Sequence, residues 1–185
     1  CTTHQADVRD HAAVAEIAAG IDQVDVLVNN AGGTFHAPFE SLSVNADETL
    51  VRENLLQVVW TTRSFLPALR RSAAASVVNV TSIEAHRAAP NYAVYAAAKA
   101  GVANLAMSLA LELAPIRINN IAVDMTPTPA MGEFGDGDTP IGRLGRVDDT
   151  AGAVVFLAGT LSGFVTGSTI HVDGGNLAAA GWHRT

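Results

Sequence analysis

A tyrosine and a lysine stand four positions apart, at Tyr95 and Lys99, in an alanine-rich stretch that predicts a helix over residues 92–113. Residues four apart on a helix share one face. An ammonium beside a phenol stabilises the phenolate and lowers the pKa of the phenol. A tyrosine tuned in this way exchanges a proton near neutral pH, which its ordinary pKa of about 10 does not favour. The same spacing is also common in amphipathic helices, so the pair alone leaves both interpretations open.

Three further features add to this pair. Ser82 follows the β-rich run at residues 76–81 and precedes Tyr95 by 13 positions. A serine at the end of a strand and a tyrosine on the following helix can converge on one point above a sheet. Asn54 falls inside a helical pattern, where asparagine is mildly unfavourable, so it has either a functional or a solvent-facing role. The segment Asn30-Ala31-Gly32 offers small residues where a backbone can approach a ligand closely.

The elements that position these residues alternate along the chain. Strand-like apolar runs and helical patterns are expected at 24–28, 47–71, 76–81, 92–113, 116–123, 148–159 and 169–172. Strand followed by helix, repeated, predicts an α/β protein with a parallel sheet covered on both faces. Pro67 is expected to bend or shorten the last turns of its helix, and Asp148 to cap the start of the next-to-last element.

Ligands of such sheets bind at the carboxyl ends of the strands. The candidate residues fall there: Asn29–Gly32, Ser82 and Asp124–Thr128 each follow an apolar run. Residues 125–145, rich in proline and glycine, are too long for a plain connection and are expected to form a lid or binding loop.

Composition bounds the class of protein. The chain has 185 residues, 49% of them hydrophobic and 16% charged, which predicts one domain and excludes intrinsic disorder. A formal net charge of −7 argues against a nucleic-acid partner. One cysteine, Cys1, fits a reducing compartment. No apolar run or leader-like segment predicts a membrane span or export, so a cytoplasmic protein is expected. The six histidines show no ligand spacing, so no metal site is expected.

Together these motifs resemble the short-chain dehydrogenase/reductase family. The matching segments are Asp7-Val8, Asn29-Asn30-Ala31-Gly32, Asn54, Ser82, Tyr95-Ala96-Ala97-Ala98-Lys99, Arg117-Ile118-Asn119 and Asp173-Gly174-Gly175. The resemblance implies an NAD- or NADP-dependent oxidoreductase on a doubly wound, three-layer Rossmann-like sheet. It also implies interconversion of a secondary alcohol and a ketone, here on a moderately apolar small molecule. A homodimer or homotetramer is expected through helices 47–71 and 92–113 and the last strand.

The resemblance also assigns roles. Tyr95 is expected to be the general acid/base, with Lys99 lowering its pKa and holding the nicotinamide ribose. Ser82 is expected to bind the substrate oxygen, and Asn54 to hold a water that relays protons through Lys99. The residues expected to bind the cofactor are Asp7, Val8, Asn30, Ala31, Gly32, Tyr95, Lys99 and Thr128, with Asp7 and Val8 at the adenine end and Thr128 at the carboxamide.

The sequence departs from the family pattern at its start. The turn T-G-x-x-x-G-x-G, which holds pyrophosphate at a helix N-terminus, is absent from these 185 residues. The N-terminal strand-helix-strand portion that contains this turn is therefore missing, and a strand expected to end near Val8 loses its pairing partner. Two explanations stay open: a piece of a longer protein, or a naturally short relative. The alternative function is accordingly a cofactor-incompetent fragment or silent subunit.

Two other positions carry open alternatives. Val123-Asp124 stands where the family usually has Pro-Gly. The carboxylate of Asp124 is expected either beside the nicotinamide, where it favours the oxidised ring, or in solvent. Trp182 is expected either to cover a substrate pocket or to pack at an interface.

Overall fold

The computed structural model describes residues 1–128 and 139–180. Its elements are α1 (His11–Ala19), β1 (Val26–Asn29), η1 (Phe39–Ser41), α2 (Val44–Val51), η2 (Arg52–Leu56), α3 (Gln57–Leu69), β2 (Ser76–Ser82), η3 (Ile83–Ala85), α4 (Ala93–Glu112), β3 (Arg117–Val123), α5 (Val147–Ala158), η5 (Thr160–Ser162), β4 (Thr169–Val172) and α6 (Asn176–Ala179). The described strands form one sheet of order β1-β2-β3-β4, and each neighbouring pair is parallel.

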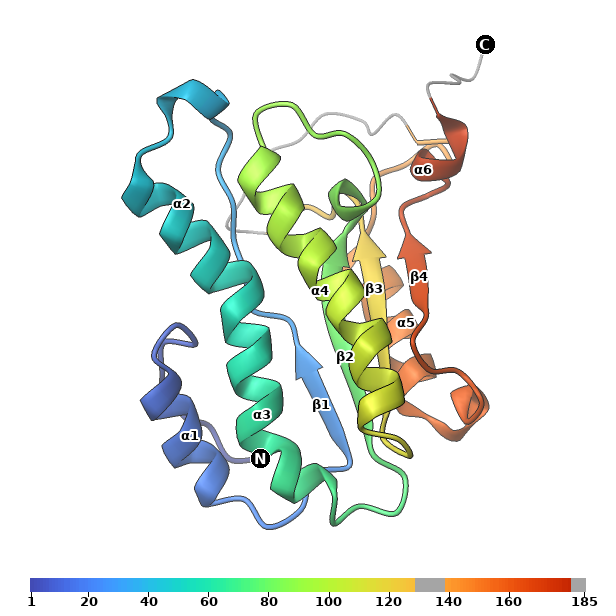
Figure 1. Ribbon diagram of the computed structural model, residues 1–185. Coiled ribbons are helices and arrows are strands. Elements are labelled where there is room, and N and C mark those ends of the chain that lie inside the picture. The colour runs from blue at the N-terminus through green and yellow to red at the C-terminus, as the bar shows by residue number, and fades with distance from the viewer. Residues whose placement is uncertain (129–138, 181–185) are drawn as a thin grey trace.

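Helices cover both faces of this sheet (Figure 1). Helices α3 and α4 lie over one face, and α5 lies over the other. Consecutive residues of β2 supply the two cores: Val77 packs in the cluster with Leu69 and Ala106, and Val78 packs with Ile121 and Leu157. Because both faces are covered, the strands need no polar alternation. The predicted three-layer, Rossmann-like α/β fold is confirmed.

The parallel register places the candidate residues at one end of the sheet. Ser82, the last residue of β2, is paired with Val123, the last residue of β3. The loop after β1, the turn η3 after β2 and the segment after β3 therefore leave the sheet on the same side, where the arrowheads point in Figure 1. This is the carboxyl end, where ligands of open parallel sheets bind.

The N-terminal segment differs from the expectation. No strand ends near Val8: residues 1–7 carry no regular structure and are exposed. Within the described residues β1 pairs with β2 alone, and Val26 and Val28 on β1 are 38% and 40% exposed. A strand needs a hydrogen-bonded neighbour, and the preceding segment has none here. The chain forms the unpredicted helix α1 instead, whose first turn is capped by Asp10 through Ala12 and Ala13 amides.

Two helix predictions also need correction. The pattern at 47–71 becomes α2, a π turn (η2) and α3, and Pro67 lies inside α3, which continues to Leu69. Asp148 does not cap α5. The N-cap is Arg146, whose amide donates to Oδ2 of Asp149 at 2.7 Å. Asp149, three positions after the N-cap, accepts the hydrogen bond from the free amide of Arg146. Asp148 lies in the first turn of the helix instead of at its N-cap. Residues 129–138 of the predicted 125–145 loop lie outside the described part.

Helix α4 is the one described helix long and apolar enough to cross a membrane by length and composition. It contains the buried Lys99 and packs against β2 and β3, as expected of a helix in a protein core. Within the described residues, no group of three or more His, Cys, Asp or Glu side chains is arranged to hold a metal ion.

Candidate active site

The π turn η2 fixes Asn54 at the centre of the site. A π turn inserts an extra residue into a helix, and such turns are frequent at functional sites. Asn54 is fully buried, and its Nδ2 donates to the carbonyl oxygens of Gly33 at 2.8 Å and Leu50 at 3.0 Å. Its Oδ1 is buried without a hydrogen-bond partner in the described structure. The amide is therefore held by its nitrogen, and its oxygen is an acceptor not yet used.

Gly32 shows what this oxygen faces. A Cβ added at Gly32 would lie 2.8 Å from Oδ1 of Asn54 and 3.1 Å from Nζ of Lys99. The unused acceptor and the ammonium therefore lie against one glycine, where a side chain would displace one of them. Gln57 fastens the same loop, because its Nε2 donates to the carbonyl oxygen of Ala31 at 3.0 Å.

Lys99 reaches this point from α4. Its side chain is 5% exposed, and Nζ donates to the carbonyl oxygen of Val80 at 3.0 Å. Burial lowers the pKa of Lys99 to about 8, and the nearby carboxylate of Glu53 acts in the opposite direction. The ammonium therefore stays mainly protonated at neutral pH, although it is nearly enclosed.

Ser82 and Tyr95 lie next to it. Ser82 is 7% exposed, and its Oγ accepts a hydrogen bond from the Glu84 amide at 3.2 Å. Burial is the largest effect on Tyr95 and raises its pKa, hydrogen bonding with Ser82 lowers it, and the carboxylate of Glu84 raises it. The Ser82 hydroxyl thus acts on the Tyr95 phenol, so the strand-end serine and the helix tyrosine lie close together.

The expected lowering of the Tyr95 pKa by Lys99 is wrong for this structure. The ammonium of Lys99 lies over the aromatic ring, 5.7 Å from its centroid. Burial opposes the phenolate more strongly than the surrounding groups stabilise it, so the pKa of Tyr95 is raised. The two side chains are close together, but burial outweighs any stabilisation of the phenolate by the ammonium.

Of the other expected cofactor residues, the structure brings the loop after β1 to this cluster, and Asp7, Val8 and Thr128 lie elsewhere in the chain with different exposures. Asn30, Ala31 and Gly32 are exposed along the loop after β1, and Thr128 is exposed beside the undescribed segment. Asp7 binds the guanidinium of Arg9 at 2.7 Å, which lowers the pKa of Asp7 to about 2, and Val8 is half-buried. The carboxylates of Asp7 and, more weakly, Glu53 raise the pKa of Arg9.

The carboxylate of Asp124 was expected either beside the nicotinamide or in solvent, and neither description covers the hydrogen bond that it makes. Its Oδ2 accepts a hydrogen bond from Nδ2 of Asn176 at 2.6 Å, which ties the end of β3 to the start of α6. Trp182 lies outside the described residues. Sequence reasoning missed Glu53, Gln57 and Glu84. Each is adjacent or near to a predicted residue, but no motif distinguished it.

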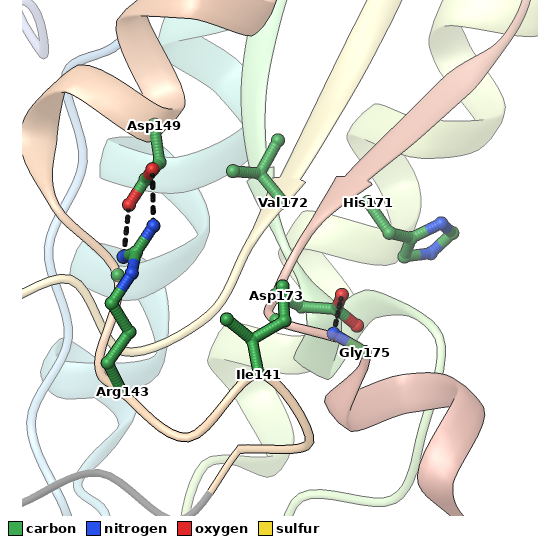
Figure 2. Close-up of a pocket in the computed structure, with 9 residues that line it drawn as sticks. Ile141, Arg143, Asp149, His171, Val172, Asp173 and Gly175 are labelled. Atoms are coloured by element: carbon green, nitrogen blue, oxygen red, sulfur yellow. Dashed lines mark hydrogen bonds and ion pairs between the residues drawn. The ribbon is translucent and has the colours of Figure 1, made fainter.

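A separate cavity of about 360 Å³ lies beside β4 (Figure 2). Arg143 forms two hydrogen bonds with Asp149, at 2.7 and 2.8 Å, and closes one wall. His171 and Val172 point to opposite sides of β4 in Figure 2. None of Asn54, Ser82, Tyr95 and Lys99 lines this cavity.

Comparison with known proteins gives the same assignment. The family described as enoyl-(acyl carrier protein) reductase matches residues 2–176. An uncharacterised oxidoreductase of Schizosaccharomyces pombe is 38% identical over 183 residues, covering 90% of this chain and 69% of that protein. An NADPH-bound short-chain oxidoreductase of Pseudomonas aeruginosa has a TM-score of 0.85 at 32% identity, covering 91% of this chain and 73% of that one. The chain belongs to the short-chain dehydrogenase/reductase family.

Aldohexose dehydrogenase of Thermoplasma acidophilum is also similar, with a TM-score of 0.90 at 27% identity over 98% of this chain and 80% of that one. The short-chain dehydrogenase/reductase chain described here is thus an enzyme of the oxidoreductase type, with a nicotinamide cofactor and small-molecule substrates.

The described residues fit part of that cofactor. Gly32 leaves open backbone at the loop after β1, and the unused Oδ1 of Asn54 and the ammonium of Lys99 face the same point. These groups suit a ribose and its attached ring. The glycine-rich turn that holds pyrophosphate in dinucleotide-binding proteins is not among the 185 residues.

Proposed function

We propose that this chain is the catalytic part of an NAD- or NADP-dependent oxidoreductase that interconverts a secondary alcohol and a ketone, organised as a single Rossmann-like domain. The observation that carries the proposal is the convergence of Asn54 Oδ1 and Lys99 Nζ on Gly32. Ser82 and Tyr95, which interact through their hydroxyl groups, provide the substrate side of the same site.

The proton chemistry follows from these side chains. The phenol of Tyr95 gives its proton to the developing alkoxide when a ketone is reduced, and its phenolate takes the hydroxyl proton in the reverse direction. Ser82 Oγ accepts from the Glu84 amide, which leaves its own proton to donate to the substrate oxygen. Both donors therefore act where negative charge grows. When bound, the nicotinamide supplies or accepts the hydride.

Lys99 and Asn54 support the proton transfer at the Tyr95 hydroxyl group. The protonated Lys99 stabilises the phenolate form of Tyr95, and the free Oδ1 of Asn54 accepts a hydrogen bond from a water next to Lys99. Asn30, Ala31 and Gly32 line the cofactor together with Tyr95 and Lys99. Asp7 and Val8 contribute at the adenine end and Thr128 at the carboxamide.

The proposed substrate is a moderately apolar small molecule. Two apolar side chains support this at the carboxyl end of the sheet: Met125, 43% exposed, and Ile141, 65% exposed. The carboxylate of Glu84, two residues after Ser82, is already paired, since its Oε1 binds Arg87 at 2.8 Å.

Replacement of the acid/base tests the proposal. Tyr95→Phe removes the exchangeable proton and keeps the ring, so turnover of secondary alcohols or ketones should be lost while the thermal unfolding midpoint is kept. Tyr92→Phe is the matched control, at the N-cap position before α4, and should keep turnover. Nicotinamide absorbance measures both. Turnover by Tyr95→Phe at the wild-type rate overturns the proposal.

A second candidate function is that of a cofactor-incompetent subunit, which the exposed side of β1 favours. Thermal unfolding with and without NAD⁺ or NADP⁺ separates the candidates. A midpoint raised by cofactor supports the enzyme. No shift in this chain, with a shift in a longer polypeptide that contains a glycine-rich turn, supports the second candidate.

We also propose a homodimer or homotetramer in the cytoplasm. Leu111 and Met107 on α4 are 84% and 50% exposed, and exposed apolar groups of this size favour association. The single cysteine, Cys1, suits a reducing compartment. Light scattering after gel filtration tests the assembly: Leu111→Glu should lower the measured mass, and a monomeric wild-type chain overturns the assembly.

A further inference from the structure

Glu53 precedes Asn54 in η2 and has no role in the proposed reaction so far. Its side chain is half-buried, and its carboxylate lies over the loop after β1. A Cβ added at Gly33 would lie 2.9 Å from Oε1 of Glu53. Three polar side chains thus lie against two successive glycines of the loop. Asn54 and Lys99 lie against Gly32, and Glu53 lies against Gly33.

The π turn explains how two consecutive residues reach one loop. Successive residues of an α-helix are rotated by about 100°, and the wider π turn rotates them by less. Asn54 is held there through the carbonyl oxygen of Gly33. Glu53 therefore lies beside an anchored contact rather than on a free helix surface.

Charged groups face Glu53 from two other elements. The negative charge of Glu53 acts to raise the pKa of Lys99 on α4. It acts in the same direction on the pKa of Arg9 in the N-terminal segment. On its own element, Arg52 lies over the ring of Trp60, 5.5 Å from the centroid. Of these cations, Lys99 is the buried one and carries the larger desolvation cost.

We propose that Glu53 is a positioning residue for Lys99: its carboxylate lies over Gly33, next to the Gly32 position that Nζ of Lys99 faces, and keeps the buried ammonium charged. The inference rests on the proposed function, because a charged Lys99 is what that reaction requires. An opposite charge nearby favours the ionised form of a group that burial would neutralise. Glu53 acts through Lys99 and not on the substrate.

The sequence permits a direct test, because Lys99 is the one lysine among the 185 residues. Protein labelled with ¹³C-lysine gives a single side-chain signal, whose chemical shift against pH reports the charge of Lys99. Glu53→Gln should move the titration midpoint down by about half a unit or more. Glu53→Asp keeps the negative charge but moves it away from Lys99, because the side chain is shorter. Its midpoint should lie between those of the wild type and Glu53→Gln.

Glu48→Gln is the matched control, since Glu48 is an exposed carboxylate on the neighbouring helix α2. It should leave the midpoint where it is in the wild type. Equal midpoints for Glu53→Gln and Glu48→Gln overturn the inference. If Glu53→Gln does not fold, Glu53→Asp decides in the same way against Glu48→Gln.

The measurement separates this inference from the proposed function. A midpoint that falls in Glu53→Gln supports the inference even where no turnover is found, and the absence of turnover counts against the proposed function alone. Where turnover is found, the alkaline limb of its pH profile should shift down with the lysine midpoint, because the reaction needs the charged lysine. An unchanged lysine midpoint in an active enzyme overturns the inference and leaves the proposed function standing.

Discussion

Gly32 and Asn54 approach so closely that a side-chain carbon at position 32 would lie 2.8 Å from Oδ1 of Asn54. Asn54 cannot retreat freely, because its Nδ2 is bound to two backbone carbonyl oxygens. Nor is there room on the other side, where Nζ of Lys99 would be 3.1 Å away. The glycine is therefore required by space.

Gly32→Ala should displace Asn54 or Lys99. Overpacking of this kind costs about 1–3 kcal/mol of stability, and it should weaken cofactor binding because the loop moves. Thermal unfolding and cofactor titration measure the two effects. Gly152→Ala in α5 is the control, because a Cβ there meets nothing within 4 Å. It should stabilise the helix by about 0.5–1 kcal/mol. Wild-type stability and affinity in Gly32→Ala would contradict the steric argument.

The lowered pKa of Lys99 predicts a pH-dependent stability. The pKa falls from 10.5 to about 8 on folding because of burial, so between these values the unfolded chain binds more protons than the folded one. The free energy of unfolding should therefore rise with pH from about 8 to 10.5, by up to roughly 3 kcal/mol at 1.36 kcal/mol per unit. Lys99→Met should lack this rise.

Urea unfolding at several pH values measures it. The comparison is best made in a Tyr95→Phe background, since the raised pKa of Tyr95 has the opposite effect. A folded tyrosine with a raised pKa loses stability as pH rises through and above the ordinary value of about 10. Parallel curves for the chain with and without Lys99 would show that the lysine is not buried as described.

The sequence predicted the strands well, for a physical reason. Runs such as Ser76–Thr81 are rich in valine, because both faces of the sheet are covered, and they bounded β2 to within one residue. The same patterns placed Ser82 and Tyr95 close together. Both predictions depend on local composition and on the rule that parallel strands end on one side.

The π turn and the depth of the site were not predictable in this way. The apolar residues of 47–71 recur at the spacing of one continuous helix. The interruption at η2 accompanies the contact between Asn54 and Gly33, which are distant in sequence. Burial, which reverses the expected shift of the Tyr95 pKa, depends on packing from several elements. Glu53 was missed because a carboxylate in a helical pattern looks like a solvated surface group.

The neighbours of Tyr95 predict the direction of its titration. Glu84 raises the pKa of Tyr95, and hydrogen bonding with Ser82 lowers it. Glu84→Gln should therefore lower the midpoint, and Ser82→Ala should raise it. The chain has two tyrosines, so in a Tyr92→Phe background the ultraviolet absorbance of tyrosinate follows Tyr95 alone. A midpoint that moves down in Ser82→Ala would show that the two hydroxyl groups do not interact as described.

A chain of buried amides crosses the sheet behind the site and makes the last prediction. Asn29 Nδ2 donates to Asn79 Oδ1 at 2.8 Å, and Asn79 Nδ2 donates to Asn120 Oδ1 at 3.1 Å. These residues are register partners on β1, β2 and β3. Asn79→Leu removes the middle amide and leaves a donor and an acceptor buried without partners, at about 1–3 kcal/mol each.

The free energy of unfolding should therefore fall by roughly 2–5 kcal/mol in Asn79→Leu, as measured by chemical denaturation. Asn104→Leu on the exposed side of α4 is the control and should change stability by less than about 0.5 kcal/mol. Equal stabilities of Asn79→Leu and Asn104→Leu would show that the buried amides do not stabilise the sheet through their hydrogen bonds.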